Sequence, residues 1–149
     1  MDLFVYGGKV MELKKIEKFI KKQKVSFVTS IDNDNFPNVK AMLKPRKIVG
    51  LKEFYFSTNT SSMRVAQYLN NPNACIYFYH KGLFRYVGVM LKGKMEVLTD
   101  QDSKSMIWHK GDILFYKGGV TDPDYCVLKF TAISGRYYCD LKTNNFDIE

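Results

Sequence analysis

A run of hydroxyl and amide side chains stands directly in front of a predicted helix. It covers residues 57–62 in the stretch "FSTNTSSMRVAQYLNNP", which begins as the end of a strand and finishes as a helix. One such side chain is enough to cap a helix, because it accepts a hydrogen bond from a free backbone N–H group. The surplus, together with Arg64 on the first turn where the helix dipole favours an anion, indicates a binding site for a negatively charged group.

A second cation, Lys40, lies on a predicted strand upstream in "NVKAMLK". A strand-borne cation, hydroxyl groups, a helix N-terminus and an arginine together make the set of donors that a phosphate group needs. Successive residues of a strand point to opposite faces. Lys40, Met42 and Lys44 are expected on one face, and Val39, Ala41 and Leu43 on the other.

Each of these residues also has a simpler interpretation, which the sequence leaves open. Lys40 can belong to a solvated strand face, and Arg64 can be an ordinary exposed helix residue. Thr58 and Ser62 can serve as helix caps. Capping and anion binding are compatible, because a hydroxyl group can accept from the backbone or donate to a phosphate oxygen.

The periodicity of apolar residues predicts a mainly β chain with peripheral helices. No strand–helix–strand rhythm is present, so antiparallel strands in a small β-barrel fit best. The expected helices cover residues 12–22, about 63–70 and 99–109, and the expected strands cover 25–31, 38–48, 51–57, 74–79, 83–98, 125–133 and 135–141.

Several single residues add local expectations. Gly88 and Gly93 predict a bend or bulge in the long strand. Thr99 has the position of a capping residue at the start of the third helix. A turn with Gly135 is expected between the last two strands, and Trp108 is interpreted as a core or interface anchor.

The composition favours an anionic partner. Lysine and arginine outnumber aspartate and glutamate by 23 to 15, which gives a net charge of +8 and fits a phosphorylated ligand, nucleic acid or an acidic surface. Cys75, Cys126 and Cys139 contain no CxxC pair and are interpreted as small buried side chains. His80 and His109 have no ligand-like spacing, so no metal site is expected.

We expect one domain, over residues 11–149. The sequence contains no signal peptide and no apolar run long enough to span a bilayer, which makes the cytoplasm the default location and excludes a membrane partner. The opening "MDLFVYGGKV" precedes Met11. The sequence leaves open whether residues 1–10 form an N-terminal arm, flexible or extended, or result from a misassigned start.

Taken in order, these motifs resemble those of the pyridoxamine 5′-phosphate oxidase-like flavin-binding split barrels, and especially their general-stress-protein subgroup. The likeness runs from Leu13 to Leu141. "FVTSIDNDNFPNVKAM" has the family's strand, turn, proline and Arg-x-Met pattern with lysine in place of arginine, and "FYFSTNTSSMRVAQYLNNPNACIYF" has its Thr/Ser loop, Ser-x-Lys/Arg helix start and Asn-Pro. "GVMLKGKMEVL" and "DPDYCVLKFTAISGRYY" complete the order.

The resemblance implies a six-stranded antiparallel split β-barrel and a homodimer that holds FMN at its subunit interface. It implies no catalytic residue, because none is carried over from the family pattern. The cofactor-binding residues implied by the likeness are Lys40, Thr58, Ser62 and Arg64 for the phosphate, and Ala41, Met42 and Ser57 along the flavin ring.

Two departures from the family pattern matter. Lys40 replaces a bidentate arginine by a point charge, which keeps the sign but loosens the geometry of the phosphate contact. Pro45 stands where the vitamin-processing oxidases have a second lysine, and their C-terminal substrate-binding Arg and Trp pattern has no match. The second departure and the missing pattern weigh against pyridoxamine 5′-phosphate as the substrate.

The sequence therefore leaves three function classes open. The first is an FMN-dependent oxidoreductase with an unknown small-molecule substrate or a nicotinamide reductant; it needs no evident general acid or base, because the flavin supplies the redox chemistry. The second is a non-catalytic module that holds or senses flavin, haem or a deazaflavin. The third, a basic β-barrel for single-stranded nucleic acid, would require aromatic and cationic residues on one exposed sheet face. The order of strand, hydroxyl loop and helix favours the first two.

Overall fold

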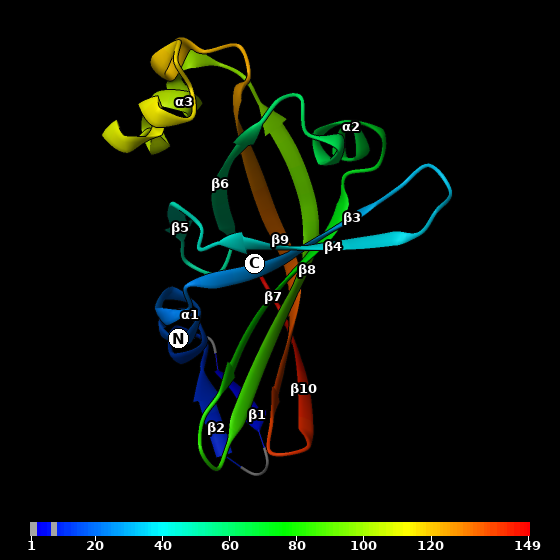
Figure 1. Cartoon of the computed structure of the whole chain (residues 1–149). Helices are drawn as coiled ribbons and strands as arrows, with labels where there is room; N and C mark the ends of the chain where they lie inside the picture. Colours follow the sequence, from blue (N-terminus) through cyan, green and yellow to red (C-terminus); the bar gives the residue numbers. More distant parts are fainter. Residues whose placement is uncertain (1–2, 7–8) are drawn as a thin grey trace.

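A curved antiparallel sheet of eight strands dominates the computed structural model, which describes residues 3–6 and 9–149 (Figure 1). The strand order is β4-β3-β7-β8-β9-β6-β5, and β10 pairs with β9. A separate hairpin consists of β1 (Leu3–Tyr6) and β2 (Lys9–Glu12). The strands of the main sheet are β3 (Val25–Ile31), β4 (Pro37–Leu43), β5 (Lys47–Val49), β6 (Glu53–Asn59), β7 (Asn73–Lys81), β8 (Tyr86–Leu98), β9 (Tyr125–Cys139) and β10 (Lys142–Asp147).

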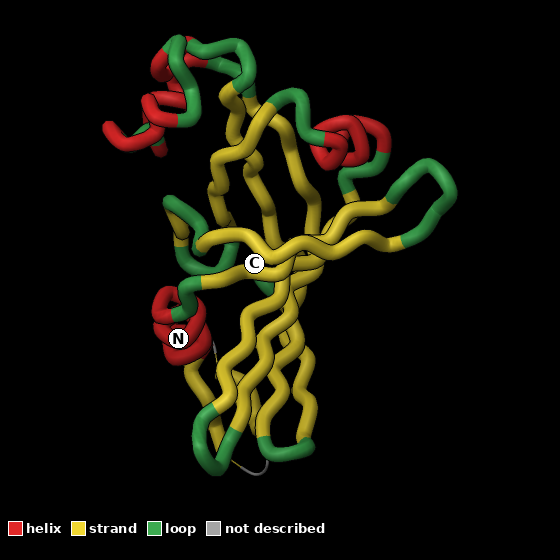
Figure 2. The backbone as a smooth tube through the Cα atoms, viewed as in Figure 1, coloured by secondary structure: helices red, strands yellow, loops and turns green. Residues whose placement is uncertain are grey.

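Helices flank the sheet at its ends and edges (Figure 2). The first, α1 (Leu13–Lys22), buries Ile16 and Ile20 and leaves its lysines exposed, as its periodicity predicts. Among the described helices none is long and apolar enough to cross a membrane. The others are α2 (Met63–Asn70), α3 (Gln101–Ile107) and the short 3₁₀ helices η1 (Lys110–Leu114) and η2 (Gly119–Thr121).

The predicted mainly β class is confirmed, and the main sheet has more strands than the six that the resemblance implies and the seven that periodicity predicts. The stretch 38–48 is not one strand: β4 ends at Leu43 and β5 begins at Lys47. Pro45 between them has no backbone N–H to donate. Lys44 N bonds to Lys24 O at 3.0 Å and Arg46 N to Tyr55 O at 2.8 Å, so this link carries the chain from one side of the barrel to the other.

The expected turn at Gly135 is absent, because β9 runs without a break from Tyr125 to Cys139. A Cβ atom at position 135 would lie 2.2 Å from Cζ of Phe146, so the glycine allows this ring on β10 to lie against the strand. The turn comes later, where Asp140 and Leu141 adopt positive φ angles of 51° and 63°. The sequence therefore predicted the wrong role for Gly135: this glycine allows a close contact within a strand and does not form a turn.

Two other local expectations have different outcomes. The predicted irregularity in β8 is confirmed at Gly93, where the register with β9 shifts and a Cβ would lie 2.0 Å from Thr131 O. The predicted cap at Thr99 is wrong, because the N-cap of α3 is Asp100, whose carboxylate accepts from Ser103 N at 2.9 Å. Residues 3–6 and 9–10 of the expected N-terminal arm lie in β1 and β2, and residues 1, 2, 7 and 8 lie outside the described part.

The core lies inside the curved sheet. Its buried rings include several phenylalanines, with Phe54 6.0 Å from Phe78 and 6.1 Å from Phe130 between ring centroids. Each buried ring stabilises the fold by roughly 1.5–3 kcal/mol relative to exposure. Cys126 and Cys139 are buried and Cys75 is half-buried, in agreement with their expected role as small apolar side chains.

Candidate functional site

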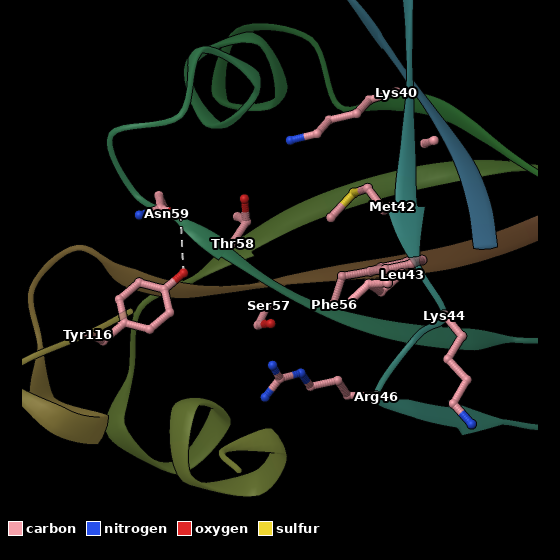
Figure 3. Close-up of a pocket in the computed structure, with 11 residues that line it drawn as sticks. Lys40, Met42, Leu43, Lys44, Arg46, Phe56, Ser57, Thr58, Asn59 and Tyr116 are labelled. Atoms are coloured by element: carbon pink, nitrogen blue, oxygen red, sulfur yellow. Dashed lines mark hydrogen bonds between the residues drawn. The ribbon is translucent and has the colours of Figure 1, made fainter. Parts of the chain in front are cut away.

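A pocket of about 320 Å³ opens between β4, the link to β5, the end of β6 and one aromatic residue from the segment after α3 (Figure 3). It combines cations, hydroxyl groups and apolar side chains, which is the composition of a site for an anionic ligand with an apolar body. Its lining residues are Lys40, Ala41, Met42, Leu43, Lys44, Arg46, Phe56, Ser57, Thr58, Asn59 and Tyr116.

Strand β4 forms one wall of the pocket. It lies at the edge of the sheet and pairs only with β3, so its other edge carries backbone N–H and C=O groups that no strand of the described chain pairs. Lys40 and Met42 project from it toward Thr58 on the opposite wall, whereas Lys44 points away (Figure 3). The wall thus offers a cation, an apolar thioether and backbone hydrogen-bonding groups.

The end of β6 forms the opposite wall. Ser57 and Thr58 are half-buried there, and Phe56 beneath them is 2% exposed. Strand β6 pairs with β5 on one side and β9 on the other, so its backbone is fixed and its hydroxyl groups are held in place. This wall supplies hydroxyl groups over an apolar floor.

The loop after β6 is anchored to the residues before β9. Thr60 N donates to Asp124 O at 2.8 Å, Ser61 N donates to Asp124 Oδ1 at 2.8 Å, and Asn59 Nδ2 donates to Asp124 Oδ2 at 2.8 Å. The hydrogen bond from Asn59, followed by that from the Ser61 backbone, holds the pKa of Asp124 below its usual range. Thr60 Oγ1 also donates to Pro123 O at 3.1 Å. Part of the hydroxyl-rich stretch therefore positions the loop.

Ser62 and Arg64 have a different environment at the start of α2. Ser62 is the N-cap residue, yet its side chain makes no capping hydrogen bond. Ser62 Oγ and Arg64 Nε are both buried, and neither has a hydrogen-bond partner among the described residues. A buried polar atom without a partner costs roughly 1–3 kcal/mol unless a group outside the described residues forms a hydrogen bond with it.

The structure brings together most of the residues predicted for the site. Five line the pocket, and the loop that leads to α2 lies at the end where Lys40 and Thr58 are found (Figure 3). Ser62 and Arg64 are not among the lining residues and belong to the start of α2 beside that end. The five lining residues are Lys40, Ala41, Met42, Ser57 and Thr58.

Sequence reasoning missed the opposite end of the pocket, which contains Arg46. Its guanidinium forms a two-pronged ion pair with Asp112 of η1: Nη2 donates to Oδ1 at 2.7 Å and Nη1 donates to Oδ2. Nη1 also donates to Ile107 O at 3.1 Å. These hydrogen bonds lower the pKa of Asp112, although burial acts in the opposite direction, and His109 N donates to the same carboxylate at 2.9 Å.

An aromatic cluster supports this end of the pocket. Tyr116 donates to Asn59 Oδ1 at 3.2 Å, and its ring centroid lies 4.8 Å from that of Tyr125. Trp108 packs edge-on against Tyr125 at 5.0 Å, which agrees with its expected role as an anchor. Burial raises the pKa of Tyr125 to about 12. No motif signalled the cluster, because its members come from separate segments.

The outer face of β3, β4 and β7 is apolar and exposed. Phe27, Val39, Tyr77 and Tyr79 line a hollow of about 510 Å³ there, together with Thr29. Val39 is 68% exposed and Phe27 38% exposed. Because β4 carries this face on one side and the pocket residues Lys40 and Met42 on the other, the two features share one strand.

The chemistry available in the pocket follows from these groups. His80 and His109 are exposed, and the described residues contain no cluster of three histidine, cysteine or acidic side chains that could hold a metal ion. One end holds cations, hydroxyl groups and a helix N-terminus, the middle is apolar, and the far end has an oriented guanidinium. This arrangement suits a ligand with a phosphate group and a flat apolar body that carries hydrogen-bond acceptors.

Comparisons with known proteins concern the sequence and the fold of the chain. The model of the pyridoxamine 5′-phosphate oxidase family matches residues 13–139. A crystal structure from Clostridium acetobutylicum, described as related to general stress protein 26 of B. subtilis and as pyridoxinephosphate oxidase family, is 39% identical, with a TM-score of 0.80. The alignment covers 91% of this chain and 94% of that chain. The comparison with curated protein sequences returned no match.

Two more distant structures share the fold. General stress protein 26 from Bacillus anthracis is 19% identical, with a TM-score of 0.71 and coverage of 90% of this chain and 98% of that chain. A heme binding protein from Mycobacterium smegmatis is 11% identical, with a TM-score of 0.72 and coverage of 91% of this chain and 57% of that chain. At these identities the likeness concerns the fold alone.

Proposed function

Because this chain belongs to the pyridoxamine 5′-phosphate oxidase family, in agreement with the resemblance of its sequence to the general-stress-protein subgroup, we propose that it is an FMN-binding oxidoreductase acting on a small molecule. The observation that carries the proposal lies at the start of α2. Ser62 Oγ and Arg64 Nε are buried without a partner among the described residues, beside the pocket end that holds Lys40 and Thr58.

The phosphate of FMN fits this end. A phosphate dianion binds best to charge-assisted donors held in fixed positions. Lys40 and Arg64 supply the charge, Thr58 and Ser62 supply hydroxyl groups, and the first turn of α2 adds backbone N–H groups and the positive end of its dipole. The unpartnered atoms of Ser62 and Arg64 would gain the hydrogen bonds that the chain itself does not provide.

The flavin ring fits the rest of the pocket. Met42 and Phe56 offer apolar surface, and Ala41 lies on the strand edge whose backbone groups are free to bind the polar atoms of the ring. Ser57 adds a hydroxyl group where the two walls meet. Bound FMN supplies hydride-transfer chemistry, and these residues would orient it and exclude water.

A homodimer would cover the apolar outer face. Contiguous exposed apolar surface of this kind marks interaction sites in soluble proteins. A second copy seated on β3, β4 and β7 would bury Phe27, Val39 and Tyr77 and place the cofactor near the subunit interface. Light scattering in dilute solution is expected to give twice the chain mass. A monomer that still binds FMN would contradict this interface.

Flavin titration tests the proposed function directly. Oxidised FMN is expected to bind, and binding is expected to quench its fluorescence. Riboflavin is expected to bind much more weakly, because the cations and hydroxyl groups act on the phosphate. The absorption spectrum of the protein as purified provides the second readout. Equal affinity for FMN and riboflavin would overturn the phosphate assignment, and a haem spectrum would overturn the choice of cofactor.

Haem is the second candidate because one similar fold is that of a heme binding protein. An iron-binding pocket usually presents a histidine, cysteine, methionine or tyrosine as axial ligand. His80 and His109 do not line the pocket, whereas Met42 and Tyr116 do. A non-catalytic flavin carrier is the other alternative. Such a carrier would bind FMN but would not oxidise NADH or NADPH when an electron acceptor is present.

A further inference from the structure

Arg46 lies at the pocket end opposite Lys40, with Met42 and Ser57 between them (Figure 3). Its side chain is 22% exposed, and its partner Asp112 is 7% exposed. The guanidinium is held in one orientation, because Nη1 donates to Asp112 and to Ile107 O and Nη2 donates to Asp112. The pocket therefore ends at an oriented guanidinium.

The guanidinium of Arg46 has N–H donors that these hydrogen bonds do not use. A guanidinium has five N–H groups, and the three hydrogen bonds to Asp112 and Ile107 leave two without a partner among the described residues. Arg46 lines the pocket, and in Figure 3 its guanidinium lies on the side of Ser57 and Tyr116. These donors are available to a ligand acceptor at this end.

We propose that Arg46 donates hydrogen bonds to the pyrimidine edge of the flavin ring and selects the reduced form of FMN. This inference rests on the proposed function. If the phosphate lies at the end with Lys40 and Ser62, the ring extends along Met42 toward Arg46. Of the two ends of the ring, only the pyrimidine end carries oxygen and nitrogen acceptors, because the opposite end carries methyl groups.

The charge balance explains why the reduced form is selected. Oxidised FMN has an uncharged ring, and an arginine already paired with Asp112 adds one hydrogen-bonding contact to it. When a reductant delivers two electrons and one proton, the ring gains a net charge of −1, which is spread over N1 and the adjacent carbonyl. Arg46 stabilises this charge in a sheltered site, where a fixed N–H donor is worth more than in water.

A substrate anion is a weaker fit for this position. Asp112 offsets much of the charge of Arg46, so any anion at this end, a substrate carboxylate or the reduced ring, is held mainly by the two unused N–H donors. The ring edge is the better fit, because a phosphate held near Lys40 brings the ring along Met42 to these donors. Substrate binding by Arg46 is therefore an outcome of the test.

The test compares Arg46→Gln with a matched control, Arg85→Gln. Arg85 also pairs with an aspartate, Asp140 at 3.1 Å, but on exposed hairpins where the two side chains are 68% and 46% exposed. FMN affinity is measured by fluorescence for the oxidised form, and the midpoint potential of bound FMN is measured by equilibration with a reference dye, with dithionite as reductant.

Arg46→Gln is expected to change oxidised FMN affinity by less than threefold and to weaken reduced FMN binding at least tenfold. A tenfold difference lowers the two-electron midpoint potential by about 30 mV. Arg85→Gln is expected to change neither. Reduction at neutral pH is expected to take up more protons per two electrons in Arg46→Gln than in the native protein, because the reduced ring loses the donor that stabilises its anionic form.

Each other outcome contradicts a specific part of the inference. Equal weakening of both FMN forms, an unchanged potential, or an unchanged proton uptake would overturn the role of Arg46. An effect confined to KM for a substrate would assign Arg46 to the substrate. Failure of the native protein to bind FMN would instead reject the proposed function. If Arg46→Gln does not fold, the double variant Arg46→Gln with Asp112→Asn removes the unpaired charge and gives the same readouts.

Discussion

The two ends of the pocket are built in different ways. At one end, Thr58, Ser62 and Arg64 come from a single continuous loop and helix start, and two of their polar atoms are buried without a partner in the described chain. At the other end, Arg46 pairs with Asp112 across 66 residues of sequence. The first end is prepared for a ligand, and the second is held by the fold.

This difference separates binding from stability. A polar group without a partner in the chain does not stabilise the fold, but it contributes to the binding free energy of a ligand that forms a hydrogen bond with it. A polar group paired within the chain contributes to folding, and its removal leaves the partner unsatisfied. Substitutions at the first end should therefore weaken ligand binding, whereas substitutions at the second end should also lower the free energy of unfolding.

The largest expected effect concerns the paired end. Arg46→Gln leaves the buried carboxylate of Asp112 without its cation and is expected to lower the free energy of unfolding by roughly 3 kcal/mol. Arg85→Gln breaks an exposed pair and is expected to lower it by less than about 1 kcal/mol. Urea denaturation of both variants without added flavin measures the difference. Equal losses would contradict the distinction between the two ion pairs.

The pH dependence of stability is a second test of the ion pair between Arg46 and Asp112. Hydrogen bonds from Arg46 lower the pKa of Asp112 in the folded state, below the ordinary value of 3.8. The stabilisation is therefore present above that value and is lost as the pH falls through the folded pKa. The native protein should lose more stability than Arg46→Gln between pH 5 and strongly acidic pH. Parallel curves for the two proteins would contradict this assignment.

At the ligand-ready end, Lys40→Ala and Arg64→Ala are each expected to weaken FMN binding by about 1.5–3 kcal/mol, the range for hydrogen bonds to charged groups. Their free energies of unfolding without FMN should remain close to that of the native protein, because neither has an ion pair in the described chain. Lys40→Arg should keep or improve affinity, since a planar fork suits phosphate oxygens. Titrations at one salt concentration measure all three, and unchanged affinity in both alanine variants would refute the phosphate site.

The same contrast explains what the sequence could predict. The ligand-ready end is local: the order of strand, hydroxyl loop and helix is visible in "FSTNTSSMRVAQ", and the family pattern adds Lys40, Ala41 and Met42. The mainly β class was also predictable, because alternation and turn residues are local signals. Even here, the sequence could not separate Thr60, which anchors the loop, from Ser62, whose side-chain oxygen has no hydrogen-bond partner among the described residues.

The paired end could not be predicted, because its contacts join distant segments. Nothing local to "KPRK" distinguishes Arg46 from the neighbouring lysines, and Asp112 lies in a short 3₁₀ helix without a motif. Gly135 illustrates the same limit: glycine in a strand indicates either a turn or a close contact, and only Phe146 on β10 decides between them. Pairing across the sheet thus determines roles that composition leaves open.

A smaller effect separates two hydroxyl groups of the same loop. Ser62→Ala is expected to weaken FMN binding by about 1 kcal/mol and to leave the free energy of unfolding without FMN unchanged or higher, because its Oγ has no partner among the described residues. Thr60→Val keeps the shape but removes the hydrogen bond to Pro123 O. It is expected to lower the free energy of unfolding by about 1 kcal/mol. Flavin titration and urea denaturation distinguish the two, and a reversed pattern would show that Ser62 is a structural cap.

The smallest expected effect tests the aromatic cluster with two tyrosines in contact. Tyr116→Phe removes the hydrogen bond to Asn59 and is expected to lower the free energy of unfolding by about 1 kcal/mol. Tyr125→Phe removes a buried hydroxyl that has no partner among the described residues, so stability is expected to stay constant or rise. Burial raises the pKa of Tyr125 from 10.0 to about 12, so its contribution is complete below pH 10 and is lost as the pH rises toward 12. Tyr125→Phe should therefore lose less stability than the native protein across that range in urea denaturation. A loss at neutral pH as large as that of Tyr116→Phe would mean that the Tyr125 hydroxyl has a partner, such as a bound water, in solution.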